Sequence, residues 1–522
     1  MGYKIQRTNK KNGITYVYEV ESYWDKFHKQ PRNRQVCIGK LDTVTGKFIP
    51  SKRLSIAQAA ARDPQVTATA EIVGPSTILD FISGRLGLPK LLKTCFPSHH
   101  RQILSMAYYL TSQGGALSHC ESWCKNHAHP FDKPLTSQRI SEILTSITIN
   151  EKQDFLGKWM NKALENDYIC YDITSVSSYA KCNEYIKYGY NRDGEKLPQI
   201  NLAMLFGQIS CLPLYYHQMP GNITDVTTLH NLLKTFKALN VKSINCVMDK
   251  GFYSKKNIDA LLTSRNKFTL PVPLNNKWIQ RAIDEIHNTV HGPQGYRKLD
   301  NEILYVHSQL YPWGDNRRRC YLHLYYNAHM RAIEADQFNE KLVTYKEELE
   351  SGNLVEEHHA AYETFFIIKT TPQRGTKVSY NDETVNKYIK RYAGFQVILS
   401  NSIKDPVRAL QVYRDKDVVE KSFDDLKNQL DMKRLRMHSS SAVEGRLFVQ
   451  FISLILMSAL RKEMRDVGLI ERYTTRELLQ EMEPLTKVRY TGKYGHILTE
   501  VSKSQRVILE LLDIDRSTLT WT

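Results

Sequence analysis

Two aspartates stand in apolar runs that are predicted to be strands, and their side chains suit metal chemistry. Asp172 lies within YDITS, and Asp249 follows the apolar segment INCVM. A carboxylate in such a run needs a cation or a metal as its partner. If the two strands are neighbours, their carboxylates lie close together, an arrangement tolerated mainly when divalent cations neutralise it. The pair therefore indicates a magnesium site, although either Asp alone would fit a loop or helix cap equally well.

A third candidate carboxylate belongs to a segment with helical spacing. Tyr413, Lys416, Glu420 and Lys427 are separated by 3, 4 and 7 positions. On one long helix this spacing places all four on the same face. Taken alone, the pattern also fits a solvated face whose Lys416–Glu420 ion pair contributes only about 0.3–0.5 kcal/mol.

The elements that must position these residues form an α/β pattern from about residue 166. Apolar runs predict three successive strands, and amphipathic runs then alternate with two further strands. A meander of three strands followed by helix, strand, helix and strand resembles the start of a ribonuclease-H-like core. The expected strands lie at 166–177, 200–208, 211–221, 244–252 and 267–273, and the helices at 224–239 and 254–264.

The remaining segments differ in polarity and in the period of their apolar residues, and we expect an α/β protein of several domains. A small β module precedes a helical domain that we expect to bind DNA, and a β-rich insertion divides the core. Within the helical domain, 134–144 predicts a helix capped by Thr136 or Ser137, either the recognition half of a helix-turn-helix or an ordinary helix. The expected domains are 1–55 (basic, β-rich), 56–165 (helical), 166–275 (first core segment), 276–394 (insertion), 395–465 (second core segment) and 466–522 (helical tail).

The net charge points to a polyanionic partner. The chain of 522 residues has 72 Lys and Arg against 55 Asp and Glu, a formal charge of +17. Such an excess favours nucleic acid or an anionic membrane surface. The most apolar run, 447–460, contains three polar residues and is shorter than the roughly 20 residues of a spanning helix. We therefore expect a buried core helix there and no membrane association.

The cysteines predict a reducing compartment. There are 9 of them, an odd number in a long chain, and the polar start MGYKIQRTNK has no apolar stretch of signal-peptide type. We expect a cytoplasmic protein, associated with the nucleoid when bound to DNA. Cys120, Cys124, His127 and His129 form the one cluster with metal-ligand types, but the spacing fits no common zinc finger, and buried thiols on a helix are the favoured interpretation.

The segment around Glu420 resembles a known signature. DDE transposases of prokaryotic insertion sequences, of the insertion sequence family four type, carry a Tyr–2–Arg–3–Glu–6–Lys pattern in their last catalytic block. Here the pattern stands as Tyr413, Lys416, Glu420 and Lys427. The spacing matches throughout, and Lys416 replaces the family's Arg. Lysine keeps the charge but lacks the planar fork that binds phosphate through two hydrogen bonds.

The two earlier blocks match in the expected order. YDITS carries Asp172, DKGFYS carries Asp249 and Tyr253, and the family-like PGNITD (220–225) lies between them. The long gap between Asp249 and Glu420 suits the mostly β insertion that members of this group carry. The resemblance covers about 166–275 and 395–460 well and the N-terminal region loosely.

The resemblance implies cut-and-paste DNA transposition. Asp172, Asp249 and Glu420 would hold two divalent cations, Mg²⁺ with Mn²⁺ as a substitute, for cleavage at the element ends and strand transfer of the 3′-hydroxyl into target DNA. The partners would be double-stranded terminal repeats and target DNA, with a homodimer in the synaptic complex. Two alternatives remain open: a ribonuclease-H-like nuclease that does not join strands, and a non-catalytic DNA-binding derivative.

The resemblance and the basic residues also suggest DNA contacts. An aromatic ring beside a cationic cluster, as in YPWGDNRRR, can stack on an extruded base; packing of Trp313 on its own strands is the other interpretation. Most of the cations are expected to contact the backbone rather than read bases. The candidate DNA-binding residues are Tyr253, Trp313, Arg317, Arg318, Tyr413, Lys416, Lys427, Lys433, Arg434 and Arg436.

Overall fold

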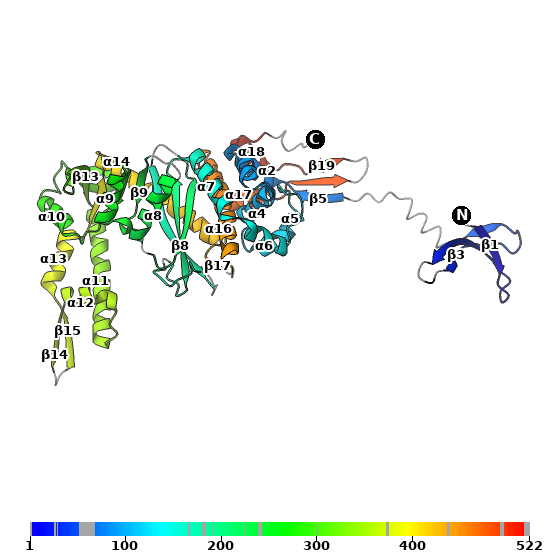
Figure 1. Ribbon diagram of the computed structural model, residues 1–522, viewed down its shortest axis with the longest axis horizontal. Coiled ribbons are helices and arrows are strands. Elements are labelled where there is room, and N and C mark those ends of the chain that lie inside the picture. Colours follow the sequence, from blue (N-terminus) through cyan, green and yellow to red (C-terminus); the bar gives the residue numbers. More distant parts are fainter. Residues whose placement is uncertain are drawn as a thin grey trace. The chain divides into compact units, whose positions relative to one another are not determined.

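The computed structural model describes most of the chain as two compact units (Figure 1). One unit comprises Met1–Ala70 with Val488–Ile497, and the other Glu71–Lys487 with Leu498–Thr522. The described residues are 3–25, 28, 30–51, 68–164, 168–179, 184–191, 193–223, 225–238, 243–299, 301–371, 375–435, 439–490 and 495–515.

The first unit contains a small antiparallel sheet at the N-terminal end of the chain. Its strands pair in sequence order, β1-β2-β3-β4, as expected from the alternating pattern of this segment. Only a few of its apolar side chains are buried, Val17, Val20 and Ile38. The strands are β1 (Tyr3–Thr8), β2 (Thr15–Asp25), β3 (Gln30–Leu41) and β4 (Phe48–Pro50).

A ten-stranded mixed sheet forms the centre of the second unit, in the order β11-β12-β13-β16-β10-β9-β6-β7-β8, with β17 pairing beside β6. Strands β6, β7 and β8 form the predicted antiparallel meander, while β9 and β10 run parallel to β6. Their apolar runs reflect burial on both faces, which is complete along β7. The core strands are β6 (Tyr168–Ser178), β7 (Gln199–Gly207), β8 (Pro213–Pro220), β9 (Asn245–Met248), β10 (Lys267–Pro271), β16 (Phe395–Ser400) and β17 (Arg434–Leu435).

Two amphipathic helices connect the parallel strands, as the sequence predicts. Helix α8 (Asp225–Ala238) leads from β8 to β9, and α9 (Lys255–Thr263) leads from β9 to β10. Ser254 caps α9 by accepting a hydrogen bond from the Asn257 backbone. The α/β class expected for this region is therefore confirmed.

The segment 276–394 is mixed α/β, so the expectation of a mostly β insertion is wrong. Strands β11 (Tyr296–Leu299), β12 (Glu302–Trp313) and β13 (Arg318–Tyr326) extend the central sheet, because β13 pairs with β16. The charged run 332–352 predicts one of its helices, which is α11 (Ala328–Ser351). The polar, mixed pattern of the rest concealed three others, α10 (Lys277–Ile286), α12 (His359–Phe365) and α13 (Asp382–Tyr392).

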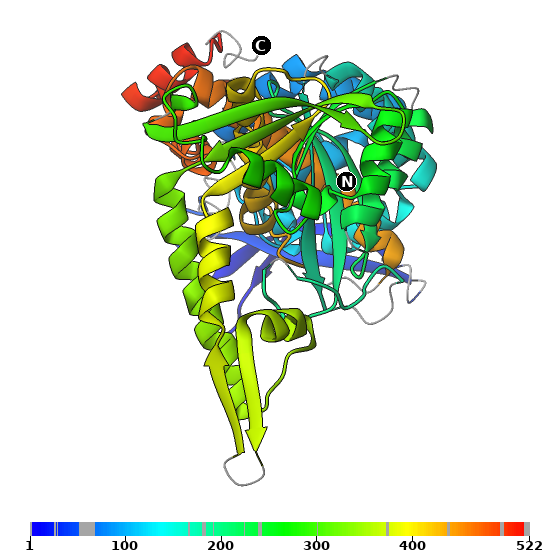
Figure 2. The same cartoon turned by 90° about the vertical axis from the view of Figure 1, so that its left-hand side faces the viewer.

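Some of this insertion forms an arm with its own small core. Figure 2 shows α11 and α13 running away from the sheet towards the hairpin of β14 (Phe366–Thr371) and β15 (Gly375–Tyr380). Leu342, Phe366 and Val378 are buried together there, apart from the main core. The arm therefore depends on few apolar contacts for its stability.

Helices around a central apolar helix form the other half of the second unit. Helix α16 (Ser440–Asp466) packs against α4 and α6. Among the described residues it is the one helix long and apolar enough to cross a membrane, but its apolar window is 94% buried, which confirms the predicted core helix. The helices of this half are α2 (Gly74–Leu86), α3 (Leu88–Cys95), α4 (His100–Ser112), α5 (Cys120–Cys124), α6 (Ser137–Ser146), α7 (Ile149–Ala163), α17 (Thr475–Met482) and α18 (Lys503–Leu511).

These helices share a compact unit with the central sheet rather than forming a unit of their own. Helix α6 is capped by Thr136, one of the two expected residues, whose side chain accepts from the Arg139 backbone. The C-terminal region is not purely helical as expected, because β18 (Thr486–Tyr490) and β19 (His496–Leu498) form a three-stranded sheet with β5 (Ala68–Ile72).

The contact between α16 and α6 allows a stability prediction. A Cβ at Gly445 would clash with the backbone carbonyl of Leu144, which has no freedom to move aside. We expect Gly445→Ala to lower the free energy of unfolding by roughly 1–3 kcal/mol, the usual cost of overpacking. Gly84→Ala on α2 is the control, since nothing lies within 4 Å of its Cβ position. Equal denaturation midpoints for the two variants would contradict this packing.

Candidate active site

The sheet register brings the two candidate aspartates together. Strands β6 and β9 are parallel neighbours, and Tyr171 pairs with Met248. Asp172 is the next residue of β6, and Asp249 directly follows the end of β9. The two aspartates therefore occupy neighbouring positions at this edge of the pairing. The expectation that adjacent strands supply both carboxylates is therefore met by the fold.

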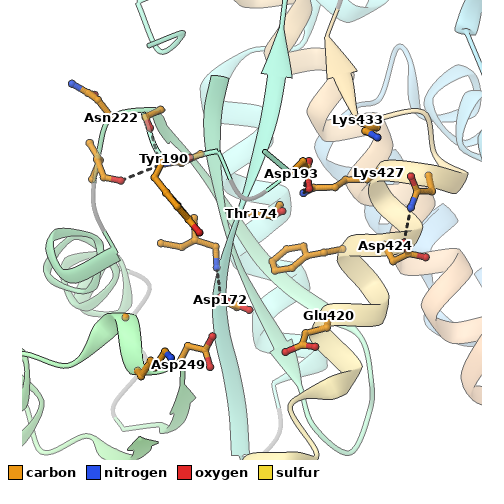
Figure 3. Close-up of a pocket in the computed structure, with 18 residues that line it drawn as sticks. Asp172, Thr174, Tyr190, Asp193, Asn222, Asp249, Glu420, Asp424, Lys427 and Lys433 are labelled. Atoms are coloured by element: carbon orange, nitrogen blue, oxygen red, sulfur yellow. Dashed lines mark hydrogen bonds and ion pairs between the residues drawn. The ribbon is translucent and has the colours of Figure 1, made fainter. Parts of the chain in front are cut away.

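The third carboxylate comes from a helix that the sequence led us to expect as one long element. The structure instead has α14 (Pro406–Arg414) and α15 (Asp417–Asp424), separated by Asp415 and Lys416. At the break the backbone hydrogen bonds join residues three positions apart, as in a 3₁₀-helix. The Lys416 N–H donates to the Tyr413 carbonyl, and the Val419 N–H donates to the Lys416 carbonyl. Glu420 lies on α15 and faces Asp172 and Asp249 (Figure 3).

Lys416 lies at the point where the three carboxylates converge. Its Nζ is 3.4 Å from Asp172 Oδ2, 3.1 Å from Asp249 Oδ1 and 3.6 Å from Glu420 Oε1. The Lys416 side chain is only 4% exposed. Burial alone would lower the pKa of Lys416, but the charges of Asp172 and Asp249 outweigh it and raise the pKa above its usual value. The ammonium therefore stays charged and holds the carboxylates together.

Tyr413 completes the polar contacts of this cluster. Its hydroxyl donates a hydrogen bond to Asp249 Oδ1 over 3.0 Å. Burial, and then the negative charge of Asp249, raise the pKa of Tyr413 far above its usual range. The hydroxyl therefore remains a neutral donor that orients the Asp249 carboxylate.

An open cavity of about 1040 Å³ lies in front of the cluster. Its floor includes Asp172, Asp249 and Glu420, and Thr174 and Tyr190 extend it along the sheet (Figure 3). Among its charged side chains the acidic ones are in excess. They are Asp172, Asp193, Asp249, Glu420 and Asp424 against Lys250, Lys427 and Lys433.

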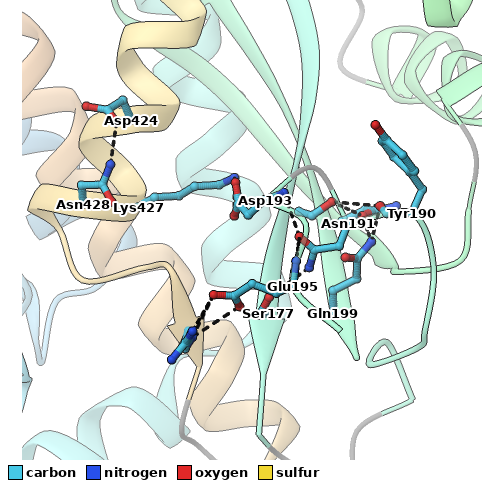
Figure 4. Close-up of polar contacts among 12 residues, drawn as sticks. Ser177, Tyr190, Asn191, Asp193, Glu195, Gln199, Asp424, Lys427 and Asn428 are labelled. Carbon is cyan, nitrogen blue, oxygen red and sulfur yellow. Dashed lines mark hydrogen bonds and ion pairs between the residues drawn. The ribbon is translucent and has the colours of Figure 1, made fainter. Parts of the chain in front are cut away.

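Two of the predicted DNA-binding cations are engaged in ion pairs (Figure 4). Lys427 lies in a π-helical turn, 425–429, and its Nζ contacts both oxygens of Asp193 at 2.7 and 2.8 Å. Arg434 makes a bidentate contact with Glu195. Lys433 lines the cavity, whereas Arg436 lies outside the described residues. Asp193 and Glu195 carried no signal in the sequence, because their partners are more than 200 positions away.

Four aromatic side chains, two of them from β12, surround a second cavity. The Trp278 ring lies 4.7 Å from the Tyr311 ring at a tilt of 35° and meets Trp313 edge-on at 5.9 Å, and its indole donates to the Tyr253 hydroxyl. The cavity they line measures about 750 Å³. Trp313 is largely buried and donates to Asp259 of α9, so it packs against α9 and α10 as well as on its own strand.

Trp278 and Tyr311 are the residues that sequence reasoning undervalued, because nothing in their spacing shows that they meet. The nearby arginines are less involved: Arg317 is exposed at the tip of the β12–β13 hairpin, and Arg318 donates to Thr263. Neither guanidinium lines the aromatic cavity.

The donor set of the acidic cluster suits divalent cations. Oxygen ligands from carboxylates are what Mg²⁺ prefers, and the three carboxylates already surround one positive charge, that of Lys416. As the side chains stand, the described residues contain no group of three Cys, His, Asp or Glu poised to hold a metal.

The Cys120–His129 cluster has the character of a packed core. Both thiols are buried on α5, with their sulfurs 3.7 Å apart, as expected for this helix. His127 stacks on Trp123, and His129 contacts the Ser105 hydroxyl. The aromatic contacts thus account for both histidines.

Comparison with known proteins shows the family of the chain. A search of curated proteins found no match. A cryo-EM structure of piggyBac transposase in a synaptic complex with hairpin DNA is similar over 78% of this chain and 76% of that chain, with 9% identity and a TM-score of 0.38, too distant to support an inference. The model of the transposase DDE domain matches residues 163–456, more than half of the chain and the whole span from Asp172 to Glu420. The chain therefore belongs to the DDE transposase family.

Proposed function

We propose that this protein catalyses cut-and-paste transposition of a prokaryotic insertion sequence of the family four type. It would cleave DNA at the element ends and transfer the freed 3′-hydroxyl into target DNA. The observation that carries the proposal is the convergence of Asp172, Asp249 and Glu420 on one point, inside the segment that the family model matches. The order β8-β7-β6-β9-β10 supports a ribonuclease-H-like core.

In this proposal the three carboxylates hold two divalent cations, Mg²⁺ or Mn²⁺. When bound, such ions activate the attacking water or 3′-hydroxyl and stabilise the leaving oxygen. Asp172 and Asp249 are fixed by adjacent strands, whereas Glu420 is 64% exposed on a short helix and has room to adjust. Tyr413 orients the Asp249 carboxylate, and Lys416 swings from the centre to a DNA phosphate.

The charge of the cavity supports this order of events. Its lining has five carboxylates and three lysines, and Lys416 lies among three of those carboxylates, so 4 − 5 gives −1, which repels a phosphodiester. Two divalent cations add +4, and the sum of +3 attracts it. Metal loading would thus precede or accompany docking of the scissile strand, while Lys427 and Lys433 line the path of its backbone.

The test is an assay with duplexes that carry the element's own ends. The wild-type protein with Mg²⁺ or Mn²⁺ should nick these ends and should join a pre-cut end to a second duplex. Cleavage without joining would favour the nuclease alternative. Tight end binding without either reaction would favour a non-catalytic derivative. Crosslinking of two chains on paired ends would test the proposed homodimer, and fractionation of host cells would test the cytoplasmic, nucleoid-associated location.

The aromatic cavity gives a more specific prediction about the bound DNA. We propose that a base extruded near the cut stacks in the cavity formed by Tyr253, Trp278, Tyr311 and Trp313. Trp278→Ala should then weaken end binding by about 1–3 kcal/mol, the usual contribution of one stacked base. A fluorescent base analogue at the end should lose the quenching that stacking on Trp278 causes.

Trp24→Ala, in the N-terminal sheet, is the matched control, because Trp24 is exposed and far along the chain from the cavity. Unchanged affinity and unchanged fluorescence in Trp278→Ala would count against base extrusion at this position.

A further inference from the structure

A second large cleft lies behind the helix that carries Glu420. It measures about 890 Å³ and is bounded by α14, α15, the C-terminal half of α16 and the turn after β7. Helix α15 separates the two cavities: Glu420 and Phe423 line the acidic one, whereas Lys421 and Ser422 line the other. The cleft is therefore a distinct surface next to the candidate active site.

Cations outnumber carboxylates in this cleft, which we call the basic cleft. Its basic side chains exceed the three acidic ones, Asp415, Asp417 and Asp466. The basic residues are Arg408, Arg414, Lys421, Arg461, Lys462 and Arg465.

Three of these cations have carboxylate partners, and three have none among the described residues. Arg414 pairs with Glu302, Arg461 with Asp425, and Lys462 with Asp466. Arg408, Lys421 and Arg465 make no ion pair with any residue in the stretches of chain that the structure describes. The basic cleft therefore keeps a net attraction for anions.

Neighbouring groups fix several of the cleft's side chains in place. The Arg465 guanidinium contacts Cys211 Sγ at 3.1 Å, and Arg408 lies over the ring of Tyr168 at 5.8 Å. Arg461 forms an ion pair with the buried carboxylate of Asp425. A preorganised group of arginines loses little side-chain entropy when it binds phosphate.

The size and chemistry of the cleft indicate the class of ligand. Its volume exceeds that of a single phosphate many times, and its unpaired cations come from α14, α15 and α16. We propose that the basic cleft binds a stretch of DNA phosphodiester backbone that is separate from the strand in the acidic cavity. This inference rests on the proposed function for the identity of the polyanion, and it adds a second DNA path across α15.

The test is the salt dependence of DNA binding by the full chain without divalent metal, between ~50 and ~200 mM salt. The triple variant Arg408→Gln, Lys421→Gln, Arg465→Gln should lower the slope of log K against log salt by about two to three, because each lost phosphate contact removes about 0.9. The control triple Lys234→Gln, Lys341→Gln, Lys387→Gln removes the same charge at exposed sites outside the segment expected to bind DNA and should keep the wild-type slope. If the first triple fails to fold, Lys421→Gln alone should lower the slope by about one.

An unchanged slope in both triples, or an equal fall in both, would overturn the proposal. Two sources of backbone are distinguished by duplex length. If a second duplex occupies the basic cleft, each wild-type chain should bind one more short duplex than each chain of the triple variant. If one duplex spans both sites, the fall in slope appears with long duplexes alone.

The outcome is independent of catalysis. If the proposed function is wrong, the wild type does not cleave DNA, but the salt slopes of the wild type and the first triple variant still differ. Failure of this inference would appear as equal slopes, with cleavage intact.

Discussion

Replacement of Glu420 by glutamine is expected to abolish metal-dependent DNA cleavage and to leave DNA binding intact. The amide keeps the shape of the side chain but removes the charge that a divalent cation requires. Loss of one metal ligand should cost about 4 kcal/mol of transition-state stabilisation, roughly a thousandfold in rate. The measurement is single-turnover nicking of a labelled end with Mg²⁺, with binding followed by fluorescence anisotropy.

Asp424→Asn is the matched control for this result. Asp424 lies one turn further along the same helix and lines the same cavity, yet its side chain contacts Asn428 and not Lys416. We expect it to cleave DNA at close to the wild-type rate. Equal rates for Glu420→Gln and the wild type would show that the third metal ligand lies elsewhere, and an equal loss in both variants would point to a general charge effect.

The sequence was sufficient for the two aspartates because strand periodicity is a local signal. Apolar runs around Asp172 and Asp249 predicted neighbouring strands, and the register Tyr171–Met248 has that arrangement. Glu420 was identified because its spacing resembles the family signature, although the helix expected there is broken at Asp415 and Lys416. The pattern succeeded because the break keeps helical backbone angles and so nearly preserves the helical face.

Contacts between distant segments could not be predicted in the same way. The role of Lys416 as the common partner of three carboxylates depends on β6, β9 and α15 meeting at one point. The pairing of Lys427 with Asp193 and the contact between the Trp278 and Tyr311 rings are also long-range. Helix α12 of the insertion was not predicted, because it has only seven residues and buries only Tyr362, so it shows little apolar periodicity.

The central position of Lys416 leads to a prediction about metal and stability. In Lys416→Met the three carboxylates lose their shared cation and repel one another. Without metal we expect a loss of roughly 1–3 kcal/mol in the free energy of unfolding, less than the ~3–5 kcal/mol of a fully buried pair, because Asp249 and Glu420 are partly exposed. Mg²⁺ should then stabilise the variant more than the wild type, since no ammonium competes for the site.

Thermal unfolding with and without Mg²⁺ measures both effects. Lys421→Met is the control, because Lys421 lies on the same helix but lines the basic cleft instead of the acidic cavity. Its unfolding temperature should respond to Mg²⁺ as the wild type does. A Lys416→Met protein that is as stable as the wild type, or that gains no more from Mg²⁺, would mean that the lysine does not occupy the place of the metal. A larger gain would identify Lys416 as the group that a divalent cation must displace before the carboxylates can act.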